Sequence, residues 1–142
     1  MKTVLALALF ALVSGCATTP TPVAEVKPIA ADRLLALQEN TGAATGAIVV
    51  TRDVGFINSA CYSAVHINGT LAARFASGET ARFLLPPGDV LLRVGRDPQG
   101  KGLCGLDKER WTQRETVLRQ NEVKHFRLTT DSNGNFDIVR GD

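Results

Sequence analysis

The chain has 142 residues, of which 16 are Lys or Arg and 14 are Asp or Glu, so its formal net charge at pH 7 is only +2. This balance provides no electrostatic basis for nucleic-acid binding. The roughly 100 residues from Gly42 onward are enough for one domain with a single core and leave no room for a second.

The first residues have the layout of a bacterial export signal. Lys2 precedes an apolar run from Val4 to Val13, and the small residues Ser14 and Gly15 lead to a cysteine. The run is far shorter than the ~20 apolar residues that a membrane-spanning helix needs. We therefore expect a signal peptide over residues 1–15 and no transmembrane anchor.

The end of this segment, Val13-Ser14-Gly15-Cys16, resembles the bacterial lipobox, whose cysteine becomes the first residue of the mature chain and carries lipid. The resemblance implies that Cys16 bears two or three acyl chains such as palmitate, which hold the protein on the membrane because each buried methylene contributes about 0.8 kcal/mol. In similar Gram-negative lipoproteins, a residue such as Ala17 after the cysteine directs the protein to the outer membrane, facing the periplasm. The alternative is a plain secretory peptide with an incidental cysteine.

A proline-rich stretch follows, from Thr18 to Pro28, with no apolar periodicity. Such a composition favours an extended, solvated spacer. Between Ile29 and Gln38 the leucines among alanines, with Asp32 near the start and Gly42 after the end, indicate either a short helix packed on the domain or a frayed extension of the linker. The sequence thus predicts a lipidated tether over residues 16–44 and a globular domain over residues 45–142.

The domain consists of short apolar or alternating segments separated by turn residues. Asn68-Gly69 is typical of a two-residue hairpin turn, and Pro86-Pro87-Gly88 must reverse the chain because proline cannot donate to a β-ladder. This pattern predicts a mostly β fold, a single small antiparallel β-sandwich of about seven strands, with a small barrel as the alternative. The expected strands cover residues 47–51, 61–68, 70–75, 80–85, 89–94, 112–118, 123–130 and 136–139.

A family resemblance is carried by apolar strand residues and turn glycines, namely Val50-Thr51-Arg52, Phe56, Val65-His66-Ile67-Asn68-Gly69, Phe75, Gly78-Glu79 and Leu85-Pro86-Pro87-Gly88. This pattern resembles small bacterial lipoproteins classed only as a domain of unknown function, whose sandwich is similar to PEGA-type surface domains. The resemblance covers residues 46–128 and implies a fold, not an activity. The sequence departs from the family in the insertion from Arg96 to Arg110.

The remaining cysteines, Cys61 and Cys104, belong to an exported domain, where two thiols indicate a disulfide. Such a bridge closes a long loop, and the chain-entropy model gives it about 4 kcal/mol. The alternative is a metal site formed by Cys61, His66, Cys104 and His125, but zinc ligands usually come in closely spaced pairs. We expect the disulfide and neither a metal nor a cofactor.

No motif indicates catalysis. Neither histidine has a serine or cysteine nucleophile motif beside it. The segment from Gly95 to Lys101 matches the first seven positions of a P-loop, but Gly102 stands where Ser or Thr must ligate magnesium, and no helix start follows. We expect no nucleotide partner and no enzyme activity.

The region from Arg93 to Arg119 holds seven basic and four acidic residues. Its candidate partner-binding residues are Arg96, Lys101, Lys108, Arg110 and Trp111, which could contact anionic lipid headgroups, cell-wall polymer or an acidic protein. The alternative is an ordinary solvated loop with Trp111 in the core.

The sequence as a whole indicates a membrane-anchored envelope lipoprotein that acts as a non-catalytic binding or structural module, with an envelope protein or the cell wall as its partner. Two alternatives stay open: an accessory component of a secretion or envelope-spanning complex, and a hydrolase of envelope polymers.

Overall fold

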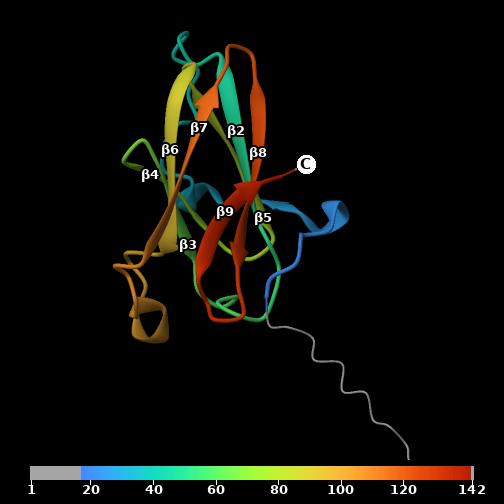
Figure 1. Cartoon of the computed structure of the whole chain (residues 1–142), viewed down its shortest axis with the longest axis vertical. Helices are drawn as coiled ribbons and strands as arrows, with labels where there is room; N and C mark the ends of the chain where they lie inside the picture. The colour runs from blue at the N-terminus through green and yellow to red at the C-terminus, as the bar shows by residue number, and fades with distance from the viewer. Residues whose placement is uncertain (1–16, 142) are drawn as a thin grey trace, which may run out of the picture.

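The computed structural model describes residues 17–141, which form two β-sheets packed face to face (Figure 1). The predicted signal peptide and the predicted lipid-attachment residue Cys16 lie outside the described residues. The first sheet has the order β1-β5-β2-β8-β9, with β1 Lys27–Pro28, β5 Glu79–Leu85, β2 Gly46–Arg52, β8 Val123–Thr130 and β9 Phe136–Arg140. The second sheet has the order β4-β3-β6-β7, with β4 Thr70–Phe75, β3 Ser63–Ile67, β6 Gly88–Arg96 and β7 Trp111–Leu118.

The prediction of a mostly β, sandwich-like fold is confirmed. Each of the eight expected strands is present, with bounds that differ from the prediction by two residues at most. Alternate side chains of both sheets meet in one core, whose largest fully buried members include Phe75, Phe83, Ile48, Ile67 and Leu92. The turns also follow the sequence, since Asn68 and Gly69 both have the positive φ angles of a tight hairpin turn, 49° and 82°.

The expected purely antiparallel arrangement is wrong for the first sheet. β2 runs parallel to β8, with Ala47 opposite Val123 and Arg52 opposite Leu128, and the short β1 runs parallel to β5. Parallel neighbours need a long crossover connection, and here the whole second sheet lies between β2 and β8 in the chain. Local turn signals define only neighbouring hairpins, so they could not reveal this pairing.

The N-terminal segment lies along the domain instead of extending away from it as a solvated spacer. Thr19 forms a β-bridge with Val54, the Thr21 hydroxyl donates to the Arg52 carbonyl at 2.9 Å, and Ile29 is buried in the core. In place of the expected helix there are only short 3-10 turns, η1 Val23–Glu25 and η2 Ala31–Arg33. Threonine hydroxyls and backbone amides pair with the sheet edge, so a proline-rich composition did not prevent docking.

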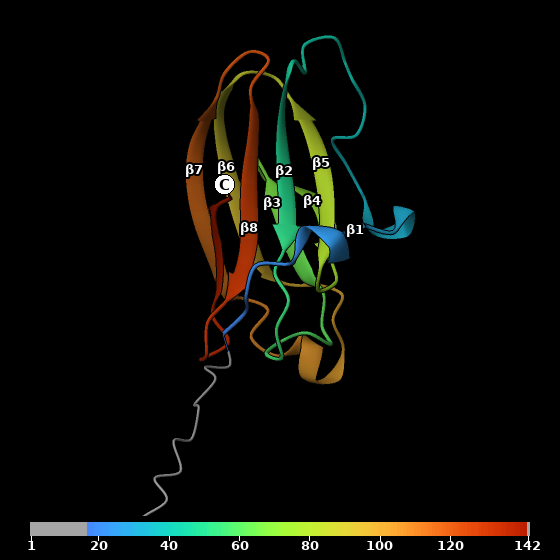
Figure 2. The same cartoon turned by 90° about the vertical axis from the view of Figure 1, so that its right-hand side faces the viewer.

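The described residues contain no α-helix, and therefore no helix long and apolar enough to cross a membrane. A third 3-10 turn, η3 Gly102–Gly105, lies in the connection between β6 and β7 at one end of the sandwich (Figures 1 and 2).

Candidate binding surface

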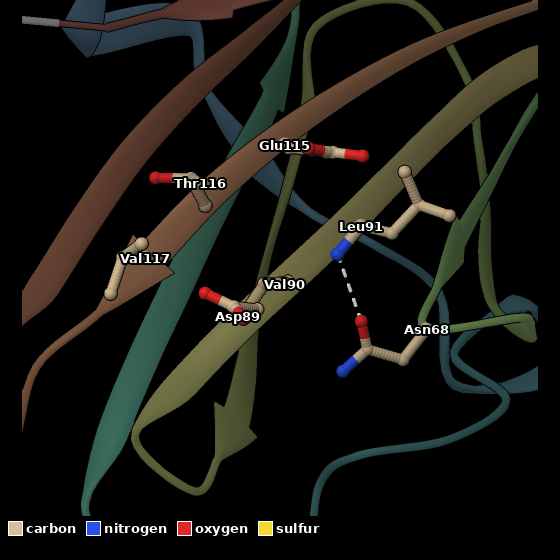
Figure 3. A pocket seen from close by; sticks show the side chains of 7 residues that line it. All are labelled: Asn68, Asp89, Val90, Leu91, Glu115, Thr116 and Val117. Carbon is tan, nitrogen blue, oxygen red and sulfur yellow. Dashed lines mark hydrogen bonds between the residues drawn. The ribbon is translucent and has the colours of Figure 1, made fainter.

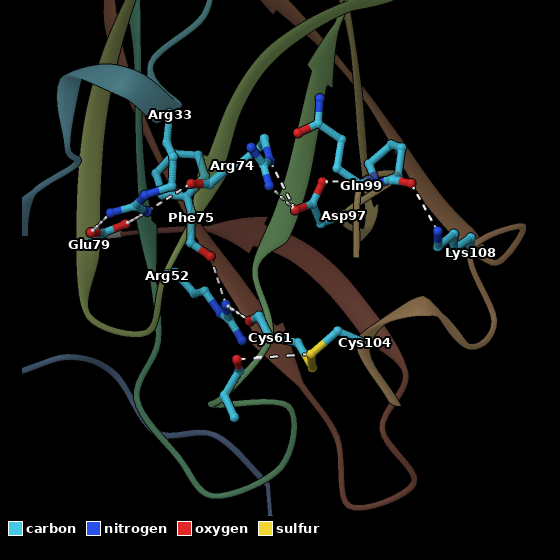
Figure 4. A network of polar contacts seen from close by, with 12 residues as sticks. Arg33, Arg52, Cys61, Arg74, Phe75, Glu79, Asp97, Gln99, Cys104 and Lys108 are labelled. Atoms are coloured by element: carbon cyan, nitrogen blue, oxygen red, sulfur yellow. Dashed lines mark hydrogen bonds and ion pairs between the residues drawn. A yellow bond between two sulfur atoms is a disulfide. The ribbon is translucent and has the colours of Figure 1, made fainter. Parts of the chain in front are cut away.

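The predicted disulfide between Cys61 and Cys104 is present in the structure (Figure 4). It joins two loops at one end of the sandwich: residues 53–62, between β2 and β3, and residues 97–110, between β6 and β7. The Cα atoms of the two cysteines are 5.4 Å apart, a usual separation for a disulfide. We refer to these two loops together as the loop platform.

Arg52 supports the platform from within. Its side chain continues the inward-facing alternation of Ile48 and Val50, and the residue is only 4% exposed. The guanidinium donates to the carbonyls of Cys61 at 2.6 Å, Phe75 at 2.7 Å and Asn58 at 2.7 Å. Burial lowers the pKa of Arg52 to about 10, so the group stays charged at neutral pH. One cation thereby satisfies three backbone acceptors of the platform and its neighbour β4.

Two ion pairs brace the base of the platform (Figure 4). Arg33 and Glu79 form a bidentate ion pair, with nitrogen–oxygen distances of 2.5 and 2.6 Å. The Nε and Nη2 atoms of Arg74 donate to one carboxylate oxygen of Asp97 at 2.9 and 2.5 Å. Both guanidinium groups lie near the ring of Tyr62, at 4.6 Å for Arg33 and 5.4 Å for Arg74. Burial raises the pKa of Glu79, but the hydrogen bonds from Arg33 and the Ala76 amide outweigh it and leave that pKa below its ordinary value.

The outer surface of the platform exposes large apolar side chains. Phe56 is 87% exposed, Leu103 is 80% exposed and Leu106 is 56% exposed. Solitary exposed apolar residues are common on proteins. Here, however, they belong to two loops that a disulfide holds together, which makes the platform a candidate contact surface.

The four basic candidates all lie on or beside the platform. Lys101 and Arg110 are exposed, whereas Arg96 and Lys108 are half-buried and donate to the carbonyls of Leu103 at 3.3 Å and Pro98 at 3.0 Å. Arg96 and Arg110 line one small pocket of about 40 Å³. The structure thus brings these four cations to the end of the sandwich that carries the exposed apolar side chains.

Trp111 lies apart from this group, on the outer face of the second sheet. The position of a Cβ on Gly95 would be 2.7 Å from the indole, so only glycine leaves room for the ring to cross β6. The His66 ring meets Trp111 edge-on at 4.8 Å, and the Arg93 guanidinium is 5.1 Å from the indole centroid. Burial, together with the charge of Arg93, lowers the pKa of His66. Trp111 therefore belongs neither to the core nor to the basic loop surface.

A shallow pocket of about 400 Å³ lies on the same outer face (Figure 3). Strand register aligns Asp89 with Val117 and Leu91 with Glu115 along its floor, and the Asn68 carboxamide oxygen accepts the Leu91 amide at 2.8 Å. Its polar lining consists of an amide, a hydroxyl and two carboxylates, without a histidine or cysteine. This pocket could not be predicted from the sequence, because it depends on the pairing of β6 with β7.

The alternative four-residue metal site does not form. Cys61 and Cys104 are bonded to each other, His66 packs against Trp111, and His125 lies on β8 in the opposite sheet. Between residues 17 and 141, no three His, Cys, Asp or Glu side chains gather in a way that could hold a metal ion.

No protein-family model matches this chain, and no curated protein matches it in sequence. The resemblance to lipoproteins with PEGA-like domains therefore stays a prediction from the residues that carry it.

Proposed function

We propose that this chain is a non-catalytic binding module of the bacterial cell envelope, anchored in the outer membrane through lipids on Cys16, facing the periplasm and acting through the loop platform. The observation that carries the proposal is the exposure of Phe56, Leu103 and Leu106 on two loops that a disulfide joins. Lys101 and Arg110 add positive charge beside them.

Pre-organisation supports a role in binding. A mobile loop must lose conformational freedom when it binds, and that loss weakens affinity. The platform is already fastened by the disulfide, by the three hydrogen bonds of Arg52 and by the pair between Arg74 and Asp97. Exposed apolar side chains on such a support can contact a partner at a small entropic cost.

The anchor is tested by cell fractionation. We expect Cys16→Ser to abolish lipid attachment, because the acceptor of the lipid is lost, and chains from which residues 1–15 are removed should move from the membrane fraction to the soluble fraction. Ser14→Gly is the matched control, since it keeps a small residue beside the cleavage site and should leave the protein in the membrane. A Cys16→Ser protein that lacks residues 1–15 and still remains membrane-bound would refute the anchor.

The binding surface is tested by photo-crosslinking in cells, with p-benzoylphenylalanine at position 103. We expect an adduct that depends on ultraviolet light and that is lost when Lys101, Lys108 and Arg110 are changed to Glu. Changing Arg82, Arg119 and Arg140 to Glu reverses the same number of charges at exposed positions elsewhere and should preserve the adduct. Equal adduct yields from the two triple variants would exclude the charged platform as the binding surface. Repeated capture of one envelope complex would favour the accessory-component alternative.

A further inference from the structure

We propose that the loop platform rests on the bilayer that holds the acyl chains of Cys16, with Phe56 and Leu103 in the headgroup region and Lys101 and Lys108 beside anionic phospholipid. This inference rests on the proposed function, because it requires the lipid anchor. It names the partner of the platform as the surface of the protein's own membrane.

The position at which the described chain begins supports this proposal. Thr18 is fixed to the platform end of the sandwich, because its amide donates to the Thr130 carbonyl at 2.9 Å and its hydroxyl accepts the Thr130 amide at 2.8 Å. Thr19 exchanges two backbone hydrogen bonds with Val54, at 2.8 and 3.1 Å. These contacts attach the segment to the first residues of the loop that carries Phe56.

Only a short length of chain separates this attachment from the proposed lipid on Cys16. Cys16 is two residues before Thr18, and two residues of extended chain reach about 7 Å. Thr18 itself packs against Gly55, where a Cβ would lie 2.9 Å from the Thr18 Cα. Phe56 directly follows Gly55 in the chain. The lipidated sulfur of Cys16 must therefore stay within a short distance of the platform. The expected long spacer is absent between them.

The start of the described chain and the loop platform lie at the same end of the sandwich. In both views the described chain starts at the end of the sandwich where η3 and the platform loops lie (Figures 1 and 2). The acyl chains must therefore enter the bilayer beside this end, and the opposite end must point away from the membrane.

The platform exposes the kinds of side chain that favour the surface of a bilayer. Phe56 and Leu103 are the most exposed large apolar side chains of the platform, and aromatic and apolar groups favour the interface of a bilayer. Four basic residues accompany them, against the exposed carboxylates of Asp107 and Glu109, while Asp97 is neutralised by Arg74. The resulting positive excess is small, so it orients the domain on anionic lipid, whereas the acyl chains provide the attachment.

The experiment uses the full-length lipoprotein, purified from membranes and reconstituted into vesicles of phosphatidylethanolamine and phosphatidylglycerol. p-Benzoylphenylalanine replaces Phe56, Leu103 or, as the matched control, Val117. Val117 is also exposed and apolar, but it lies near the far end of β7, about 20 Å along the strand from the platform. After illumination, mass spectrometry measures the lipid adducts and, in the same sample, the acylation of Cys16.

We expect lipid adducts at positions 56 and 103 in yields on the order of tenfold above position 117, because 20 Å exceeds the reach of the probe. Lys101→Glu with Lys108→Glu should lower the yield at position 103. Acylated protein that gives equal yields at all three positions, or adducts only with a second protein copy, would overturn the inference and leave the proposed anchor intact. An unacylated Cys16 would overturn both.

Discussion

Arg52→Met tests whether one buried cation holds the platform together. The substitution keeps an unbranched apolar side chain of similar length and removes all three hydrogen bonds to the carbonyls of Asn58, Cys61 and Phe75. Hydrogen bonds to charged groups are worth about 1.5–3 kcal/mol each, and buried carbonyls left without a partner add a desolvation cost. Because Arg52 is 4% exposed, water can replace only part of what is lost.

We expect the free energy of unfolding to fall by about 3–5 kcal/mol, since the three contributions overlap and do not simply add. That is a large fraction of the ~5–15 kcal/mol that stabilises an ordinary domain. Arg52→Lys should cause an intermediate loss, because an ammonium cannot span three carbonyls as a planar guanidinium does. Arg82→Met, at an exposed position of β5, is the control and should change stability by no more than about 0.5 kcal/mol.

The assay is urea unfolding at neutral pH, followed by circular dichroism and by the fluorescence of Trp111, with linear extrapolation to water. Arg52→Met should lower the free energy of unfolding by clearly more than Arg82→Met does. If the two losses differ by less than about 1 kcal/mol, the hydrogen bonds of Arg52 do not support the platform.

Three further outcomes are expected. Cys61→Ser with Cys104→Ser should lower stability by about 4 kcal/mol, from the 43-residue separation that the bridge closes, and an unchanged urea midpoint would contradict this. Gly95→Ala should displace the indole and shift the emission of Trp111 to longer wavelength, whereas an unchanged spectrum would mean that the ring does not cross β6. His66 has a pKa below 6.5 in the folded protein, so the unfolded chain binds a proton first as the pH falls. The free energy of unfolding should therefore decrease with falling pH below about 6.5, and His66→Gln should remove that part of the dependence; an identical profile in the variant would refute it.

The strands could be predicted well from the sequence, because the pattern of apolar and polar residues within each strand reflects which of its side chains are buried. β2 contains the continuous apolar run Ala47–Val50, buried and less buried side chains alternate in β5, and in the Asn68-Gly69 turn the backbone conformation follows from local chemistry. The parallel pairing of β2 with β8 leaves no local signature, because it depends on how the two sheets meet.

The buried charges were missed because arginine and glutamate are usually exposed. A signal was nevertheless present in the alternation. Arg52 follows Ile48 and Val50 at a spacing of two, and Glu79 precedes Ala81 and Phe83 in the same way, so both occupy inward positions at the platform end of their strands. Their partners, backbone carbonyls for Arg52 and Arg33 for Glu79, come from distant segments and could not be read from the sequence.

The four basic candidates lie close together in the structure, whereas Trp111 lies apart from them on the outer face of the second sheet. Arg96, Lys101, Lys108 and Arg110 follow one another in a single loop region, so proximity in sequence carried over into space. Trp111 begins β7, and the direction of its side chain depends on the space left by Gly95 in the neighbouring strand.

The docked N-terminal segment restricts how far the domain can move from the proposed anchor on Cys16. A long solvated spacer would let the domain sample many heights and orientations above the membrane. The hydrogen bonds of Thr18 and Thr19 instead attach the domain close to Cys16, the residue for which we propose lipidation. In the proposed orientation, the outer face of the second sheet, with Trp111 and the pocket at Asn68 and Leu91, stays free for other contacts.

The proposal with the widest consequences is that lipid on Cys16, two residues before the docked Thr18, holds the domain on the membrane. Intact mass spectrometry of the mature protein, extracted from bacterial membranes, tests this most directly. The expected result is a chain that begins at Cys16 and carries a diacylglyceryl group on the sulfur with a further acyl chain. A chain recovered from the soluble fraction with a free Cys16 thiol, or one that still carries residues 1–15, would contradict the account.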